Sequence, residues 1–178
     1  MDFADHGRPL DHLDVRALQE LLAEHQPHTN KIDAAGNQIM LAPMKGHYKM
    51  RSNTTMNASG RFHEYCPPEL VEEQMEQLLT WHRDHIAHRV RPEIEAAWLH
   101  HRFAQIHPFQ DGNGRVARCL ATIVMLMGGA FPLVIRLEDK PRYFDALRTA
   151  DSGNLRPLVR LFAKAEIKEL KRAIGLEG

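Results

Sequence analysis

A chain of 178 residues, 43% of them hydrophobic and 26% charged, is long enough to bury the core of one globular domain. Its 23 Lys and Arg residues balance 23 Asp and Glu residues, so no charge excess indicates a nucleic-acid or anionic-membrane surface. Two cysteines are too few for a disulfide framework, and the first residues lack the basic and then apolar order of a signal peptide. We therefore expect a cytoplasmic protein that binds neither nucleic acid nor membrane.

Apolar residues recur at helical spacing along most of the chain, which predicts an all-α fold, a compact helical bundle. The first apolar stripe covers 10–22, where Asp11 or Asp14 can cap the helix. A second helix should start at Pro67-Pro68-Glu69 and run to about Trp81.

Pro92 opens a third helix, and its apolar residues fall on two faces, so this helix is expected to lie centrally. It should end near Ile106, because Pro108 disfavours helical geometry at His107. The next helix, from Arg115 to about Met127, is apolar on nearly every side and should be the most buried.

The C-terminal third of the chain predicts two more helices. Gly128-Gly129 ends the buried helix. The further helices are expected at about 139–150 and 155–172, with Asn154 as a cap for the second.

The segment from Gly46 to Tyr65 departs from the helical pattern. Tyr48-Lys49-Met50 and Phe62-His63-Glu64-Tyr65 can form short strands around an Asn-, Ser- and Gly-rich turn over 52–60. We therefore expect a small β-hairpin flap at about 46–65, within a single domain that spans 1–178.

The stretch most suited to chemistry reads His-Pro-Phe-Gln-Asp-Gly-Asn-Gly-Arg-Val-Ala-Arg, from His107 to Arg118. His107 should lie on a loop after a helix, where imidazole can accept a hydroxyl proton near neutral pH. The structural alternative is a histidine that bonds a nearby carbonyl. Asp111 is a carboxylate able to hold Mg²⁺ beside a phosphate.

Gly112-Asn113-Gly114 tolerates positive φ, so its N–H groups can form an anion nest where the next helix begins. Arg115 and Arg118 lie three residues apart on that helix and can reach the same anion. The loop and helix over 107–128 therefore predict a site that binds a polyphosphate and breaks a P–O bond. The plainer alternative is a turn followed by two solvated arginines.

His82, His85 and His88 are spaced by three residues, which raises the question of a metal site. No carboxylate or cysteine is patterned with them in the sequence. A solvated connector between two helices is the better interpretation of this segment.

The twelve residues from His107 to Arg118 match each fixed position of His-Pro-Phe-x-Asp-Gly-Asn-Gly-Arg-x-x-Arg. This is similar to the signature of the Fic (filamentation induced by cAMP) family, and the resemblance covers about residues 40–170. The part from Arg142-Tyr143-Phe144 to Ala163-Lys164 resembles the branch that contains the metazoan endoplasmic-reticulum Fic enzyme. The resemblance implies a protein adenylyltransferase, a nucleotidyltransferase that moves AMP from Mg-ATP to a Ser, Thr or Tyr hydroxyl and releases pyrophosphate.

The resemblance also implies a role for each matching residue. His107 would deprotonate the target hydroxyl, and Asp111 would hold Mg²⁺. The protein substrate would dock on the flap hairpin by strand addition. The implied nucleotide-binding residues are Gly112, Asn113 and Gly114 at the α- and β-phosphates, Arg115 and Arg118 at the pyrophosphate, and Tyr143 at the adenine, with Asp151 and Phe144 where that branch has an asparagine and a second tyrosine.

Many members of the family carry an inhibitory helix with the pattern [S/T]-x-x-x-E-[G/N], and this chain has no intact copy. The segment from Ala173 to Gly178 keeps the Glu-Gly pair but has alanine where a hydroxyl is expected, which makes it a candidate for a degenerate brake. Otherwise the alternatives are a constitutively competent chain, a chain restrained by a separate inhibitory partner, or a truncated chain. Self-modification is a further expected reaction. Removal of AMP, transfer of another nucleotide and a non-catalytic nucleotide-binding module remain alternative functions.

Overall fold

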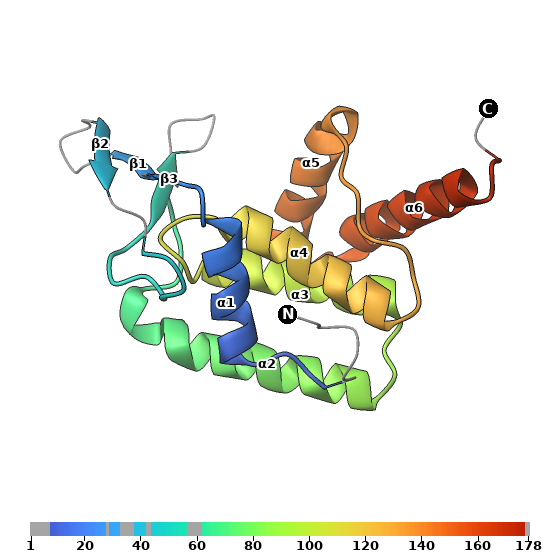
Figure 1. The fold of residues 1–178 in the computed structure, drawn as a ribbon, viewed down its shortest axis with the longest axis horizontal. Coiled ribbons are helices and arrows are strands. Elements are labelled where there is room, and N and C mark those ends of the chain that lie inside the picture. Colours follow the sequence, from blue (N-terminus) through green and yellow to red (C-terminus); the bar gives the residue numbers. More distant parts are fainter. Residues whose placement is uncertain (1–7, 28, 33–37, 42–43, 57–61, 177–178) are drawn as a thin grey trace. The chain divides into compact units, whose positions relative to one another are not determined.

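The computed structural model describes residues 8–27, 29–32, 38–41, 44–56 and 62–176. Helices make up most of this part of the chain, which confirms the predicted all-α class (Figure 1). Within it, no helix is both long enough and apolar enough to cross a membrane. The α-helices are α1 His12–Leu22, α2 Val71–Ala87, α3 Pro92–Ile106, α4 Asn113–Met127, α5 Lys140–Asp151 and α6 Arg156–Ala173, and the short 3₁₀ helices are η1 Pro68–Leu70 and η2 Leu137–Asp139.

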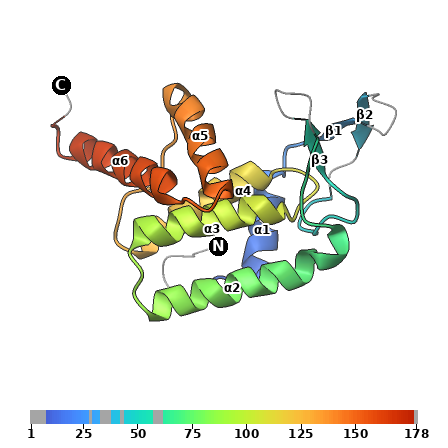
Figure 2. The same ribbon diagram turned by 180° about the vertical axis from the view of Figure 1, so that it is seen from behind.

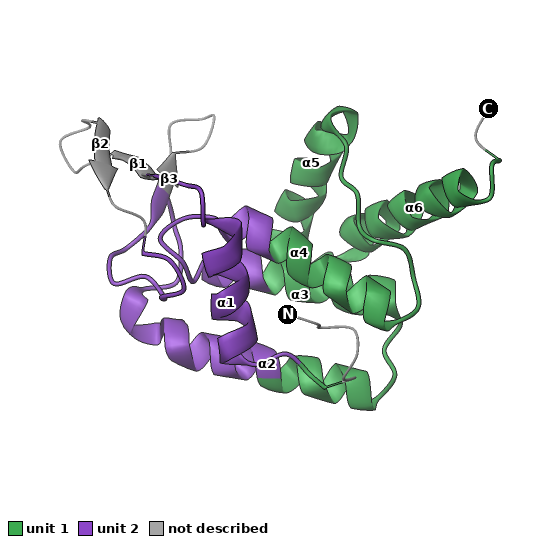
Figure 3. Cartoon of the chain, viewed as in Figure 1, with its two compact units in different colours: residues 1–9, 80–102, 117–178 green, residues 10–79, 103–116 purple. Residues whose placement is uncertain are grey.

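The described residues cluster into two compact units (Figure 3). Unit 1 contains 80–102 and 117–178, and unit 2 contains 10–79 and 103–116. The predicted site residues fall in both units, because Arg118 and Tyr143 belong to unit 1 and the other predicted site residues belong to unit 2. A single domain over the whole chain stays a prediction.

In unit 2, α1 begins where the cap signals place it. The Asp14 N–H donates to Asp11 Oδ1 at 2.9 Å and the Asp11 N–H donates to Asp14 Oδ2 at 3.0 Å, so each side chain serves the other's backbone. The buried apolar residues of this unit include Leu10, Val15, Leu18, Ala23, Val71, Met75, Leu78, Leu79, Phe103, Ile106, Phe109 and Val116.

The predicted flap is a hairpin, but its first strand is not where the sequence suggested. Strand β3 Thr54–Met56 pairs antiparallel with β4 Phe62–Glu64, which confirms the second predicted strand. Tyr48 instead forms an isolated bridge with Phe109, so the expected strand at 48–50 is wrong. Part of the predicted turn, 57–60, lies outside the described residues.

A second hairpin in unit 2 was not predicted. Strands β1 Thr29–Ile32 and β2 Gln38–Leu41 pair antiparallel, with Thr29 opposite Leu41 and Ile32 opposite Gln38. Strands of four residues are too short to display a reliable period-2 alternation, which explains why the pattern gave no signal.

Unit 1 contains the C-terminal helices, and α5 packs against α6 (Figure 2). The N-cap of α6 is Leu155 and not Asn154 as predicted, although the Arg156 N–H does donate to Asn154 Oδ1 at 3.2 Å. Gly128 ends α4 where a Cβ atom would lie 2.1 Å from Pro92 Cγ, so only glycine fits this close approach. The buried apolar residues include Ala96, Ala97, Leu99, Ala117, Leu120, Ala121, Val124, Met125, Tyr143, Ala146, Ala150, Leu158 and Phe162. The Glu-Gly remnant at 177–178 lies outside the described residues.

The predicted solvated connector after Trp81 is wrong, because α2 continues to Ala87. His82 is fully buried and its Nδ1 lies 2.7 Å from Glu95 Oε1. His85 Nδ1 lies 2.5 Å from the other oxygen of the same carboxylate. His82 and His85 therefore share the buried carboxylate of Glu95 on α3, which lies thirteen residues after His82 and ten after His85.

Candidate active site

His107 follows the last residue of α3 and has a left-handed backbone, with φ of 53°. Its N–H still donates to the Phe103 carbonyl at 2.9 Å, so the chain leaves the helix just after it. A non-glycine residue pays roughly 1–2 kcal/mol for this conformation, and such strain is concentrated at functional sites. The loop position predicted from Pro108 is confirmed.

Contacts with Ala104 and Tyr65 help to orient the imidazole of His107. Its Nδ1 lies 3.3 Å from the Ala104 carbonyl, and its ring stacks on Tyr65 with 3.8 Å between ring centroids and 17° between planes. Because a carbonyl oxygen only accepts, Nδ1 carries the hydrogen of the neutral ring and Nε2 is its acceptor. The carbonyl contact that the sequence left as an alternative to catalysis thus fixes the tautomer that a general base needs.

The loop after His107 is clamped by the side chain of Asn113. Asn113 Oδ1 accepts from the Phe109 N–H and Asn113 Nδ2 donates to the Phe109 carbonyl, both at 2.8 Å. Both residues are buried, with 2% and 0% exposure respectively. The Asn113 side chain therefore shapes the loop, and the backbone N–H of Asn113 is the group assigned to the predicted phosphate cradle.

Residues of the segment before β3 hold the same loop from the other side. The Lys49 N–H donates to the Pro108 carbonyl at 2.8 Å, and Asn53 Nδ2 donates to the Phe109 carbonyl at 2.8 Å. Gln110 Nε2 donates back to Asn53 Oδ1, also at 2.8 Å. Sequence reasoning missed these contacts, because short polar side chains some fifty residues away carry no periodic signal.

The turn into α4 depends on Gly112. Its φ is 84°, whereas Asn113 and Gly114 are the first two residues of α4. The predicted nest therefore uses left-handed geometry at Gly112 and the N-terminus of α4 beyond it. The first N–H groups of a helix have no intrahelical acceptor, which is the basis of anion binding at such a terminus.

Gln26 links the predicted metal ligand to the first arginine. Gln26 Nε2 donates to Asp111 Oδ2 at 2.5 Å, and Arg115 donates to Gln26 Oε1 at 2.5 Å. Arg115 also donates to the Leu22 carbonyl at the end of α1, at 2.8 Å. The other carboxylate oxygen of Asp111 accepts from the Gly112 N–H at 2.6 Å. Unit 2 thus brings Asp111, Gly112 and Arg115 together around one amide that the sequence did not indicate.

Unit 1 brings together the other two predicted residues, Arg118 and Tyr143. Burial raises the pKa of Tyr143, and a hydrogen bond from Arg118 to its oxygen opposes part of that rise. Tyr143 Oη also lies 2.9 Å from His100 Nε2. A cavity of about 160 Å³ is lined by Arg118, Ile135, Arg136, Leu137, Lys140, Tyr143 and Phe144.

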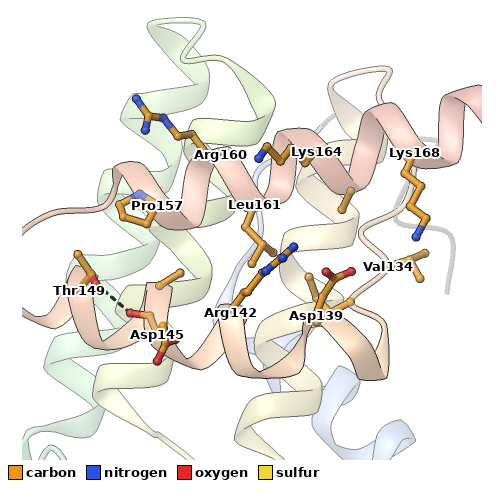
Figure 4. Close-up of a pocket in the computed structure, with 13 residues that line it drawn as sticks. Val134, Asp139, Arg142, Asp145, Thr149, Pro157, Arg160, Leu161, Lys164 and Lys168 are labelled. Carbon is orange, nitrogen blue, oxygen red and sulfur yellow. Dashed lines mark hydrogen bonds between the residues drawn. The ribbon is translucent and has the colours of Figure 1, made fainter.

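A larger cavity of about 490 Å³ lies between α5 and α6 (Figure 4). Arg142 and Asp139 face it from one side and Arg160 and Lys164 from α6. None of the predicted site residues lines it, so its size does not make it the candidate nucleotide site.

Acid is expected to lower the free energy of unfolding by about 2 kcal/mol between pH 7 and pH 5 through His100 alone. Burial, and then the charges of Arg118 and His101, lower the pKa of His100 from 6.5 to about 3. Over this range the unfolded chain binds a proton that the folded chain does not, so stability is lost as the pH falls. Urea denaturation at both pH values should show that acid lowers the free energy of unfolding less in His100→Met than in the wild type. Equal losses would contradict the lowered pKa of His100 as the cause.

Comparison with known proteins gives the family. A profile of the Fic/DOC family matches residues 9–125. The chain belongs to this family, as the resemblance of the motif implied. The helical fold and the motif residues are therefore those of a Fic domain.

Individual relatives agree with this assignment. The protein adenylyltransferase fic-1 of Caenorhabditis elegans is 37% identical over 125 residues, which is 70% of this chain and 24% of that protein. The protein adenylyltransferase Fic of Nematostella vectensis is 36% identical over 97 residues, 54% of this chain and 23% of that protein. The match thus spans about a quarter of the length of these relatives.

Solved structures share the fold. A Fic domain containing signaling protein from Bacteroides thetaiotaomicron has a TM-score of 0.83 and 29% identity, and the alignment covers 97% of this chain and 65% of that one. A structure of C. elegans Fic-1 has a TM-score of 0.72 and 27% identity, with 97% of this chain and 45% of that chain covered.

Proposed function

We propose that the chain is a protein adenylyltransferase that transfers AMP from Mg-ATP to a Ser, Thr or Tyr hydroxyl of a protein. The observation that carries this proposal is His107, whose Nδ1 is held by the Ala104 carbonyl so that Nε2 is the acceptor. This base lies on the same loop as Gly112 and the N-terminus of α4. A module that only binds nucleotide would need the anion site but not the base.

The proposed reaction is an in-line displacement at the α-phosphorus. The target hydroxyl oxygen forms a bond to that phosphorus, and its proton passes to His107 Nε2. The bond from the α-phosphorus to the bridging oxygen breaks, and pyrophosphate leaves with the electron pair. The backbone N–H groups from Gly112 onward, together with Arg115 and Arg118 of α4, would offset the negative charge.

Mg²⁺ fits this site through a single protein carboxylate. The described residues contain no cluster of three or more His, Cys, Asp or Glu side chains arranged to hold a metal. Magnesium commonly binds one or two carboxylates and completes its shell with substrate phosphates and water. Asp111 directly precedes the glycine of the anion nest, so it is the ligand we propose. The ion would neutralise phosphate charge during the displacement.

The flap suits a protein substrate. Strand β4 Phe62–Glu64 leads directly into Tyr65, which stacks on His107. A two-stranded sheet has backbone edges at which a third strand can add. A peptide added along β4 would therefore pass close to the general base, which is why we propose the flap as its docking site.

Incubation with ATP labelled at the α-phosphate should place label on a protein acceptor or on the chain itself. Label should be lost when EDTA removes Mg²⁺ and should not appear with γ-labelled ATP. GTP, UTP and CTP in parallel test transfer of another nucleotide, and release of AMP from a modified protein tests the reverse activity. Mg-ATP binding without any transfer would instead identify a nucleotide-binding module.

A further inference from the structure

His100 is a buried histidine for which the proposed reaction has no role. It lies on α3 seven positions before His107, and it is 1% exposed. Its ring meets the rings of Tyr143 and Phe162 edge to face, each at 5.6 Å between centroids. Its Nε2 lies 2.9 Å from Tyr143 Oη.

The two ring nitrogens of His100 have different surroundings. Nδ1 is buried and has no hydrogen-bond partner among the described residues, whereas Nε2 faces the Tyr143 oxygen. Hydrogen on Nδ1 would bury an orphan donor, which proteins avoid more strongly than an unused acceptor. The hydrogen of the neutral ring therefore belongs on Nε2, and His100 donates to Tyr143.

Tyr143 accepts from a second donor. Arg118 also gives a hydrogen bond to its oxygen. With both lone pairs of the phenol occupied, the O–H hydrogen of Tyr143 is directed to a third group. Tyr143 and Arg118 line the same cavity of about 160 Å³, together with Arg136 and Lys140, so an anion there would meet this hydroxyl beside the guanidinium.

We propose that His100 is a positioning residue that acts through Tyr143 on Arg118, and that the Tyr143 hydroxyl donates to a phosphate oxygen of the bound nucleotide, in place of the adenine contact that the resemblance implied. This inference rests on the proposed function for the identity of the ligand. A permanently neutral ring suits the role, because a second cation beside Arg118 would repel it. The burial that keeps the pKa of His100 near 3 provides that neutrality.

Calorimetric titration with Mg-ATP tests the inference without requiring any transfer. His100→Met and Tyr143→Phe should each weaken ATP binding by about tenfold, the scale of one hydrogen bond to a charged group. The affinity of the double variant for ATP should lie within about twofold of that of either single variant, because both changes break the same chain of contacts. His100→Gln, which can present an amide N–H near the position of Nε2, should recover most of the affinity.

Phe162→Leu is the matched control. It loosens packing around the same ring but leaves the hydrogen bond to Tyr143, so it should lower stability and keep ATP affinity within about twofold. Unchanged affinity in Tyr143→Phe would overturn the inference, as would a double variant whose losses simply multiply. If wild-type protein binds ATP but transfers no AMP, the proposed function fails while the comparison of affinities still decides the role of His100.

Discussion

Replacing His107 by alanine is expected to lower the rate of AMP transfer by about 10²- to 10⁴-fold, the usual contribution of a general base. Binding of Mg-ATP should change by less than about twofold, because the cradle at Gly112 and α4 stays in place. Stability should be unchanged or slightly lower, since alanine gives up the hydrogen bond to Ala104 and still occupies a strained φ of 53°. Initial rates with α-labelled ATP at saturation, together with calorimetry, measure the two effects separately.

His88 offers a matched control for this variant. Its Nδ1 also lies near a helix carbonyl, that of Asp84 at 2.8 Å, but the residue is exposed and outside the proposed site. His88→Ala should keep the wild-type rate and affinity. A His107→Ala protein that still transfers at the wild-type rate would remove the base from the mechanism, and one that loses ATP binding would assign His107 to the nucleotide instead.

Local signals in the sequence were enough to place most helix ends. Asp11 caps α1, and α3 runs from Pro92 to Ile106, just before the predicted break at Pro108. These residues act within one or two turns of backbone, so their effect is visible in a short window. Predictions failed where a contact between residues on different elements determines the end of a helix. Helix α2 continues past Trp81, and His82 is buried against Glu95 of the next helix.

The residues of the candidate site are visible in the sequence, whereas the contacts that support them are not. The motif places the proposed base His107, the proposed metal ligand Asp111 and the glycine turn at Gly112 within one short stretch of the sequence. What fixes them comes from far along the chain: Gln26 lies 85 positions from Asp111, and Asn53 lies 56 from Phe109. Neither spacing nor periodicity connects residues so far apart.

Asn113→Ala is expected to lower the free energy of unfolding by about 3 kcal/mol and the transfer rate by at least about 100-fold. The Phe109 carbonyl would keep Asn53 as a donor, but the buried Phe109 N–H would lose its acceptor. An orphaned donor in the loop can be relieved only by moving the loop, and that displaces His107 from the substrate. Urea denaturation and initial rates measure the two losses. His107→Ala should show the second loss without the first, which separates a positioning role from a chemical one.

Asn154→Ala controls for loss of an asparagine at a helix start. Its side chain accepts from the Arg156 N–H at 3.2 Å in exposed surroundings, so the change should cost less than about 1 kcal/mol and leave transfer unchanged.

If Asn113 contacted phosphate through its side chain, Asn113→Ala would weaken ATP binding while the protein stayed as stable as the wild type. That result would contradict the clamp. The Asn113 amide bonds both backbone groups of Phe109, so its removal should destabilise the loop, and only one acceptor lone pair and one N–H of the amide remain for other partners. A loss of stability that accompanies the loss of rate is therefore the outcome that the geometry requires.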